Sequence, residues 1–277
     1  MKSSGKGVRI ATYMILVIAL VYVLFPIIII ILTAFRSQAD LYQGPFTIPK
    51  DFNMEENFER AWNIGRIGKY AKNSLIISIS TIATVIFCST LSGYAFAKIK
   101  FLGNKSLFNV LLLGMMVPFQ AIMIPVYFQL NTFGLLNTRM AVIVLLVSEG
   151  LPFGTFLMRS FTKGIPDDIS ESGRLDGCSE FRIFYSLVLP LTFPAWISLI
   201  IFEAMWSWNN FIIPLLLVYN EEIKPIPLGL LYFQGRYTSE YTVIAMAMLI
   251  SLLPLIMIYI LLQRKFTSGI TAGALKG

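Results

Sequence analysis

Residues 11–35 read ATYMILVIALVYVLFPIIIIILTAF, a continuous apolar stretch without a single charged side chain. A helix of about 20 apolar residues is long enough to cross the roughly 30 Å hydrocarbon core of a bilayer. The basic residues Lys2, Lys6 and Arg9 precede the stretch, as they would in a signal peptide. The stretch is too long for a signal peptide, however, and lacks a small-residue cleavage site. We therefore expect it to remain in the protein as a membrane anchor.

The composition of the whole chain is that of a membrane protein. Of its 277 residues, 56% are hydrophobic and only 13% are charged, whereas a soluble domain carries roughly 25% charged residues. The chain has no His and only two cysteines, Cys88 and Cys178, which give neither a disulfide framework nor the spacing of a metal site. It also lacks a run of basic residues, which argues against nucleic-acid binding. We expect no bound metal and no cofactor on this chain.

Five more apolar segments follow the first. The six predicted spans cover residues 11–35, 73–99, 106–130, 139–160, 191–219 and 242–262. Each segment is continuously apolar, without the alternation of a membrane β-barrel, so helices are predicted. The predicted fold class is all-α, a polytopic membrane protein in which residues 1–277 form a single transmembrane domain. Every span except the second contains proline, which removes a backbone donor and kinks a helix.

The distribution of positive charge predicts the orientation of the chain. Thirteen of the 22 Lys and Arg residues lie before the first span, in residues 98–105 and 159–190 around the ends of the second and fourth spans, and in the C-terminal tail 263–277. Positively charged loops stay on the cytoplasmic side of the membrane. An even number of spans also places both termini on the same side. We therefore expect a multi-pass protein of the plasma or inner membrane with both termini in the cytoplasm.

The loop 163–190 carries the most specific pattern in the chain. Pro166 followed by Asp167 and Asp168 is typical of a helix start. Asp176-Gly177 then predicts a turn, after which apolar residues recur at helical spacing, at Phe181, Phe184, Tyr185 and Val188. Two short helices that meet at an angle are expected. Composition alone leaves a simpler alternative open, a solvated loop that contains a turn.

The sequence of this loop resembles a known motif. Glu171-Ser-Gly-Arg-Leu-Asp-Gly-Cys178, followed by Leu189-Pro190, is similar to the EAA loop in the membrane subunits of ABC importers. Ser172 and Gly173 replace the two alanines of the motif, and Cys178 replaces another small residue, so the shape of the loop should be kept. The segments that begin at Trp208-Asn-Asn and Pro227-Leu-Gly, together with the tail 263–277, resemble the shorter permease subunit of maltose-type oligosaccharide importers. The similarity covers nearly the whole chain.

This resemblance implies the fold of a type I ABC importer permease and a set of partners. The partners are two copies of a cytoplasmic ATPase that binds ATP and Mg²⁺, a homologous second permease that completes a heterodimeric pathway, an extracytoplasmic solute-binding protein, and a sugar. In such proteins the loop is a coupling helix seated in the ATPase. The corresponding positions here are Glu171, Ser172, Gly173, Asp176 and Gly177. The chain has no Gly-x-x-x-x-Gly-Lys-Ser/Thr motif, so ATP hydrolysis is expected on a separate subunit and not on this chain.

Two further groups of residues are candidates for contacts with substrate or binding protein. Glu203, Trp206, Asn209 and Asn210 in the fifth span could form a polar stripe along the sugar pathway. Interhelical hydrogen bonding is the alternative, and we favour it because it is common in membrane bundles. In the loop 220–241 the resemblance implies that Tyr232, Phe233 and Gln234 contact the binding protein. The alternative for these aromatics is the headgroup region of the bilayer.

Glu149 and Glu203 support a rival hypothesis. Carboxylates are costly within a membrane and often mark proton relays. A proton-coupled secondary carrier would account for these two acids but would leave the loop 163–190 unexplained. A membrane-embedded enzyme is a weaker rival, because the chain offers no set of residues suited to acid–base or metal chemistry.

Overall fold

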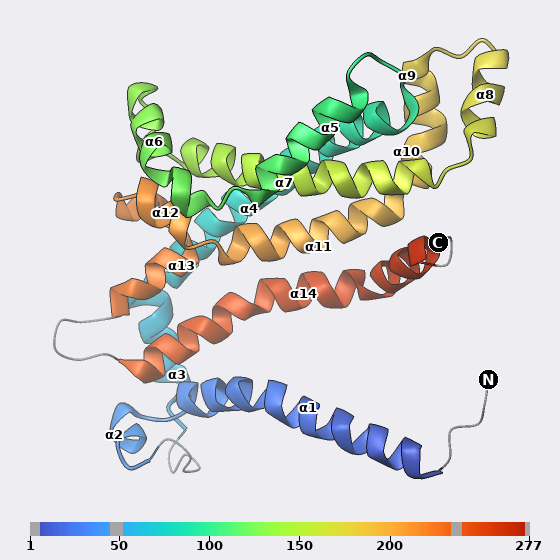
Figure 1. Cartoon of the computed structure of the whole chain (residues 1–277). Helices are drawn as coiled ribbons and strands as arrows, with labels where there is room; N and C mark the ends of the chain where they lie inside the picture. Colours follow the sequence, from blue (N-terminus) through green and yellow to red (C-terminus); the bar gives the residue numbers. More distant parts are fainter. Residues whose placement is uncertain (1–5, 45–51, 234–239, 275–277) are drawn as a thin grey trace. The chain divides into compact units, whose positions relative to one another are not determined.

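The computed structural model describes residues 6–44, 52–233 and 240–274 (Figure 1). All regular secondary structure in these ranges is helical, which confirms the all-α prediction. Four helices are long and apolar enough to cross a membrane, and each agrees with a predicted span. They are α1 (Lys6–Ala34), α4 (Ile67–Lys98), α7 (Arg139–Lys163) and α14 (Tyr241–Ala274). Helix α14 continues to Ala274, so residues 263–274 of the tail are helical.

The predicted span 106–130 is broken into two helices. The first break separates α5 (Asn104–Leu113) and the 3₁₀ turn η2 (Gly114–Met116) from α6 (Phe119–Thr132), with a bend of 99°. Val117 is extended there, with a ψ of 111°, because the ring of Pro118 disfavours a helical residue before it. Counted as one span each, the two bent pairs bring the total to six.

A second bend lies at Thr192, where residues 180–191 meet α11 (Phe193–Asn209) at 70°. Residues 180–190 belong to the predicted loop 163–190, so the bend lies at the start of the predicted span 191–219 and not inside it. Residues 180–191 comprise α9 (Glu180–Ile183), the π-helix η3 (Phe184–Val188) and α10 (Leu189–Leu191), and α12 (Ile212–Leu217) follows α11. Prolines 26, 125, 152 and 254 lie inside continuous helices. Proline therefore interrupts the helix at position 118, whereas at these four positions the helix continues through the proline.

The chain divides into two compact units. The first comprises residues 1–68 and 229–253, and the second comprises residues 69–228 and 254–277. In the first unit, α1 is followed by α2 (Gln38–Leu41), α3 (Met54–Glu59) and the π-helix η1 (Arg60–Ile64). The side-chain amide of Asn57 donates to the carbonyl oxygens of Ala34 (2.8 Å) and Arg36 (2.9 Å). These bonds fix the end of α1, whose last carbonyls have no partner within the helix.

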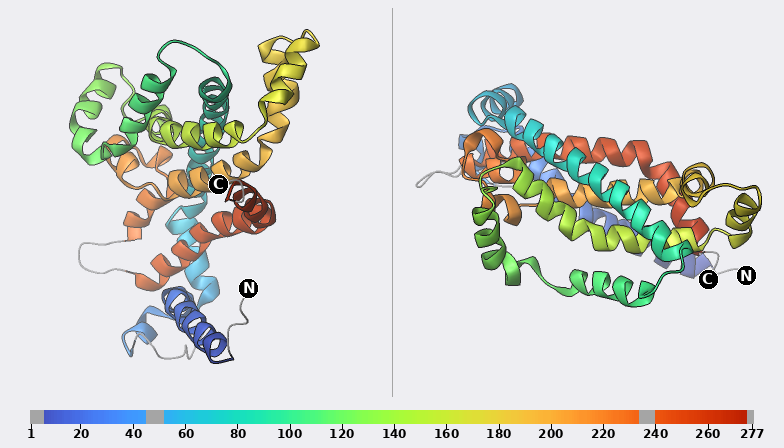
Figure 2. Two further views of the ribbon diagram at one scale, coloured as in Figure 1. Left: turned by 45° about the vertical axis from the view of Figure 1, so that its right-hand side comes forward. Right: turned by 90° about the horizontal axis from the view of Figure 1, so that it is seen from above.

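Close packing of α4 against α7 organises the second unit, and Figure 2 shows the two helices side by side. Glycine permits the close approach. A Cβ atom on Gly154 would lie 2.3 Å from Ser89 Oγ, and one on Gly93 would lie 2.6 Å from Met158 Cβ. The hydroxyl groups of Ser92 and Thr155 are hydrogen-bonded across the interface at 2.8 Å. Small residues and hydroxyl bonds of this kind join helices in membrane proteins.

Candidate functional site

The loop 163–190 forms the two short helices that the sequence predicts. Helix α8 (Asp167–Leu175) follows Pro166 and has two acids in its first turn. The turn after it contains Gly177 at a φ of +76°, a left-handed conformation that favours glycine. Ser179 then caps α9, its side chain accepting a hydrogen bond from the Arg182 backbone. Figure 1 shows α8 and α9 together at one end of the second unit.

An ion pair fastens the start of α8 to the last turn of α4. Lys98 Nζ donates to the carbonyl oxygen of Ile165 at 2.6 Å and to Asp167 Oδ1 at 2.5 Å. The Lys98 side chain is only 5% exposed. The hydrogen bond from Lys98, together with its positive charge, holds the pKa of Asp167 below its usual value. The position of α8 is thereby tied to that of α4.

A second set of contacts fastens α9 to α4. Tyr94 OH donates to Glu180 Oε2 at 2.9 Å, and Arg174 Nε donates to Glu180 Oε1 at 2.6 Å. The ring of Tyr94 packs against that of Phe184, with centroids 5.1 Å apart. Tyr94, Phe184 and two aliphatic residues form a buried cluster; the aliphatic members are Ile183 and Val188. Carboxylate bonds and apolar packing together make α8, α9 and the end of α4 one assembly.

The structure separates the five predicted coupling residues into two groups. Gly173 is buried, and a Cβ atom there would lie 3.0 Å from both Ile183 Cγ1 and Leu187 Cδ1. Its small size therefore serves packing within the loop. The other four residues are exposed, namely Glu171, Ser172, Asp176 and Gly177.

The loop also exposes two apolar side chains that the sequence did not identify as contact residues. Leu175, at the end of α8, is 89% exposed, and Phe181, in α9, is 72% exposed. Exposed apolar side chains beside polar ones are a feature of protein interfaces. For Leu175 the signal was available, because it is one of only two large apolar residues in a mostly polar helix, the other being Ile169.

The candidate substrate residues in α11 do not share one environment. Glu203 is buried and faces α7, where a Cβ atom on Gly150 would lie 2.6 Å from Glu203 Oε2. Trp206 is exposed and packs edge-on against Phe153, with ring centroids 6.0 Å apart. The Asn209 side chain is also exposed and donates to the carbonyl of Met205 at 2.9 Å, while Asn210 Oδ1 accepts from the Ile213 backbone. Glu149 is on the exposed surface of α7.

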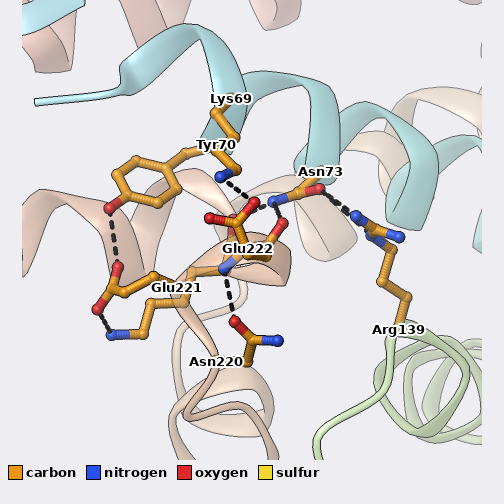
Figure 3. A network of polar contacts seen from close by, with 8 residues as sticks. Lys69, Tyr70, Asn73, Arg139, Asn220, Glu221 and Glu222 are labelled. Carbon is orange, nitrogen blue, oxygen red and sulfur yellow. Dashed lines mark hydrogen bonds and ion pairs between the residues drawn. The ribbon is translucent and has the colours of Figure 1, made fainter. Parts of the chain in front are cut away.

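A polar network that the sequence did not reveal lies at the N-terminal end of α4 (Figure 3). Asn73 Nδ2 donates to the carbonyl oxygens of Glu222 (3.0 Å) and Lys224 (2.9 Å), and Asn73 Oδ1 accepts from Arg139 Nη2 at 2.9 Å. Tyr70 OH donates to Glu221 Oε2 at 2.9 Å. Lys69 forms an ion pair with Glu222. These contacts join the first turns of α4 and α7 to the loop after α12.

The predicted contacts with a binding protein are only partly within the described residues. Phe233 ends the 3₁₀ turn η5 (Leu230–Phe233) and is buried. Its ring fills the space beside Gly65, where a Cβ atom would overlap it. The side chain of Tyr232 and all of Gln234 lie outside the described part of the chain. Within that part, no group of three or more His, Cys, Asp or Glu residues could hold a metal ion.

Comparison with known proteins gives a consistent result. Residues 70–271 match the family model described as the binding-protein-dependent transport system inner membrane component. The chain is 32% identical to an arabinooligosaccharides transport system permease protein of Bacillus subtilis, over 96% of this chain and 95% of that protein. It is 28% identical to a diacetylchitobiose uptake system permease protein of Streptomyces coelicolor, over 99% and 91% of the two chains.

The fold also matches a solved structure, a chain of a bacterial ABC transporter involved in the import of the acidic polysaccharide alginate. The TM-score is 0.84 at 22% identity, over 96% of this chain and all of the other. The comparisons confirm the predicted family and the type of fold, and they give no support to a proton-coupled carrier. In such importers a separate ATPase subunit hydrolyses ATP. The chain is a multi-pass membrane protein and belongs to the family of binding-protein-dependent transport system inner membrane components.

Proposed function

We propose that this chain is one of two homologous permease subunits in an ATP-driven oligosaccharide importer. Residues 1–277 act as a single permease domain that supplies half of the translocation pathway and has both termini in the cytoplasm. The partners are two copies of the ATPase, which bind ATP and Mg²⁺, a second permease and a solute-binding protein. The names of the two similar permeases, for arabinooligosaccharides and diacetylchitobiose, support an oligosaccharide as the substrate.

The observation that carries the proposal is the attachment of α8 and α9 to the end of α4. Lys98 and Tyr94 connect the loop to this long helix, while Glu171, Ser172 and Asp176 remain exposed. Coupling between two sites requires an element whose position both sites influence. Here the ATPase binds the exposed face of α8, including Leu175, and displacement of α8 moves α4. Gly173 and Gly177 maintain the shape of this face.

For the substrate pathway we propose a division of roles within α11. Trp206 and Asn209 lie on the exposed face of the helix, and we assign this face to the sugar pathway because an aromatic ring and an amide suit sugar rings and hydroxyl groups. Glu203 and Asn210 support the helices around it. We retain Tyr232 and Gln234 as contacts with the binding protein, and we assign Phe233 the role of holding their loop against Gly65.

A charge-reversal experiment tests the coupling role. Glu171→Lys should reduce sugar uptake at least tenfold. The new lysine would face either a positive charge of the ATPase or no partner at all, and both are costly where water is excluded from the contact between α8 and the ATPase. ATP hydrolysis by the assembly should then no longer respond to sugar and binding protein. Lys105→Glu is the matched control, since Lys105 is also exposed but lies on α5. Uptake and stimulated ATPase activity are measured in proteoliposomes at equal amounts of permease. Normal uptake with Glu171→Lys would disprove the assignment of α8.

A further inference from the structure

A basic cavity of about 470 Å³ lies against α8. Glu171, which we assign to coupling, and the ion pair of Lys98 with Asp167, which ties α8 to α4, line part of it, but its basic residues Lys100, Arg159 and Lys163 have no assigned function. It is lined by the end of α4, the start of α5, the last turns of α7, and α8. Five of the lining residues are basic: Lys98, Lys100, Arg159, Lys163 and Arg174. Two are acidic, Asp167 and Glu171. The balance of charge therefore favours an anion.

Not all of these charges are neutralised within the protein. Lys98 is paired with Asp167, and Arg174 is paired with Glu180. Lys100 and Lys163, by contrast, form no ion pair among the described residues. The guanidinium of Arg159 is held 3.8 Å above the ring centre of Phe108, with Nε directed at the carbonyl of Phe96. These contacts fix the orientation of Arg159, but they do not neutralise its positive charge.

An unsatisfied hydroxyl group in the cavity wall points to a missing ligand. Ser170 is 2% exposed, and its Oγ has no hydrogen-bond partner. A buried polar group without a partner costs about 1–3 kcal/mol, so such groups usually have a partner. An anion bound in the cavity would supply an acceptor for the three cationic side chains of Lys100, Arg159 and Lys163, and for this hydroxyl once its side chain turns toward the cavity.

We propose that this cavity binds the phosphate group of an anionic membrane lipid. Arg and Lys bind phosphate through charge-assisted hydrogen bonds, and basic pockets between membrane helices on the cytoplasmic side bind anionic headgroups. The cavity lies where the spans α4 and α7 end, so a bilayer crossed by these helices would bring its headgroups to this level. Phe101, which lines it, and the neighbouring Leu102 are exposed apolar side chains that suit the acyl chains. The proposal uses the proposed function only to identify the leaflet as cytoplasmic.

Lipid binding by the purified full chain, together with any subunits that copurify, tests the proposal directly. Fluorescent phosphatidylglycerol is titrated into the protein in neutral detergent, with phosphatidylcholine as the uncharged comparison. Lys100→Gln combined with Lys163→Gln should weaken phosphatidylglycerol binding by about 30-fold, because each lysine near an anionic surface contributes about a factor of five. The control Lys105→Gln removes an exposed lysine that does not line the cavity, and it should change binding less than twofold. The double replacement by arginine should preserve binding.

The variant Ser170→Ala distinguishes a role of Ser170 in ligand binding from a role in the stability of the protein. The hydroxyl has no partner within the protein, so its removal should leave the thermal unfolding midpoint unchanged or raise it. Affinity for phosphatidylglycerol should nevertheless fall about fivefold, the value of one net hydrogen bond of about 1 kcal/mol. A lower unfolding midpoint with unchanged lipid affinity would overturn the assignment of Ser170 and of the cavity.

Two other results would contradict the proposal that a lipid occupies the cavity. Binding that is equal for all lysine variants would show that the cavity is not the site. Full displacement of the lipid by millimolar inorganic phosphate would assign the cavity to a soluble anion. Because lipid binding is measured without transport, failure of this proposal leaves the importer function standing. Glu171 itself lines the cavity, so the lipid proposal is tested with the lysine and serine variants and not with Glu171→Lys.

Discussion

The two ends of α4 hold their neighbouring loops by different chemistry. At the N-terminal end, Asn73 binds two backbone carbonyl oxygens and Ser74 Oγ accepts from the Ile226 backbone at 2.9 Å. At the C-terminal end, Tyr94 and Lys98 bind the carboxylates of Glu180 and Asp167. The first loop is therefore held largely through its main chain, and the second largely through side chains.

This difference predicts which loop can move. Separation of the first loop from α4 would unpair the buried Ile226 N–H and two part-buried carbonyl groups, and a buried unpaired group costs about 1–3 kcal/mol. Separation of the second loop would leave carboxylates that water can solvate, but it would also unpair the Ile165 carbonyl and the buried Lys98 and would expose the apolar cluster around Ile183. We infer that the first loop is anchored through its main chain and that the second loop moves as one body with the C-terminal end of α4, as a coupling element requires.

The largest effect is expected from Asn73→Leu. Asn73 is 2% exposed, and the substitution would leave two carbonyl groups and the guanidinium of Arg139 without this partner. The free energy of unfolding should fall by about 3 kcal/mol. Denaturation in mixed micelles measures it. Asn209→Leu is the control, because that exposed amide bonds only within its own helix, and it should cost less than about 1 kcal/mol. Equal losses for the two variants would remove the contrast between the ends of α4.

A pair of substitutions in α8 should give the next largest effect. Gly173→Val would place a branched side chain against Ile183 and Leu187, and overpacking of this kind costs about 1–3 kcal/mol. Ser172→Val affects an exposed position and should change stability by about 0.5 kcal/mol. Stability is again measured by denaturation in micelles, and sugar uptake is measured in parallel. Ser172→Val should reduce uptake without loss of stability. If Gly173→Val is as stable as the unmodified protein, then the small residue does not serve packing.

The sequence predicted the features that depend on local pattern. Apolar length located the spans, Pro166 marked the start of α8, and Asp176-Gly177 marked the turn. The break at Pro118 was predicted only as a kink, because the size of a bend depends on the packing around it. The face of α11 on which each polar residue lies was equally inaccessible, since several helices surround it. The network at Asn73 could not be predicted, because its acceptors are backbone carbonyls, which every residue possesses.

The smallest effect is expected from protonation of Asp167. Its hydrogen bond from Lys98 lowers its pKa, so the folded state holds the ionised form more strongly than the unfolded state does. The resulting stabilisation is complete above the unfolded pKa of about 4 and disappears as the pH falls through the lower folded value. Asp167→Asn should therefore be slightly less stable than the unmodified protein at pH 7, and the difference should vanish as the pH falls below the folded pKa of Asp167. Unfolding midpoints measured as a function of pH provide the comparison, and added salt should reduce the difference at pH 7.

Asn73→Leu is the control for this pH dependence. Its loss of stability should be largely independent of pH, because the carbonyl acceptors of Asn73 do not titrate. A deficit of Asp167→Asn that persisted at low pH would mean that this end of α4 is fixed by its shape and not by its charges.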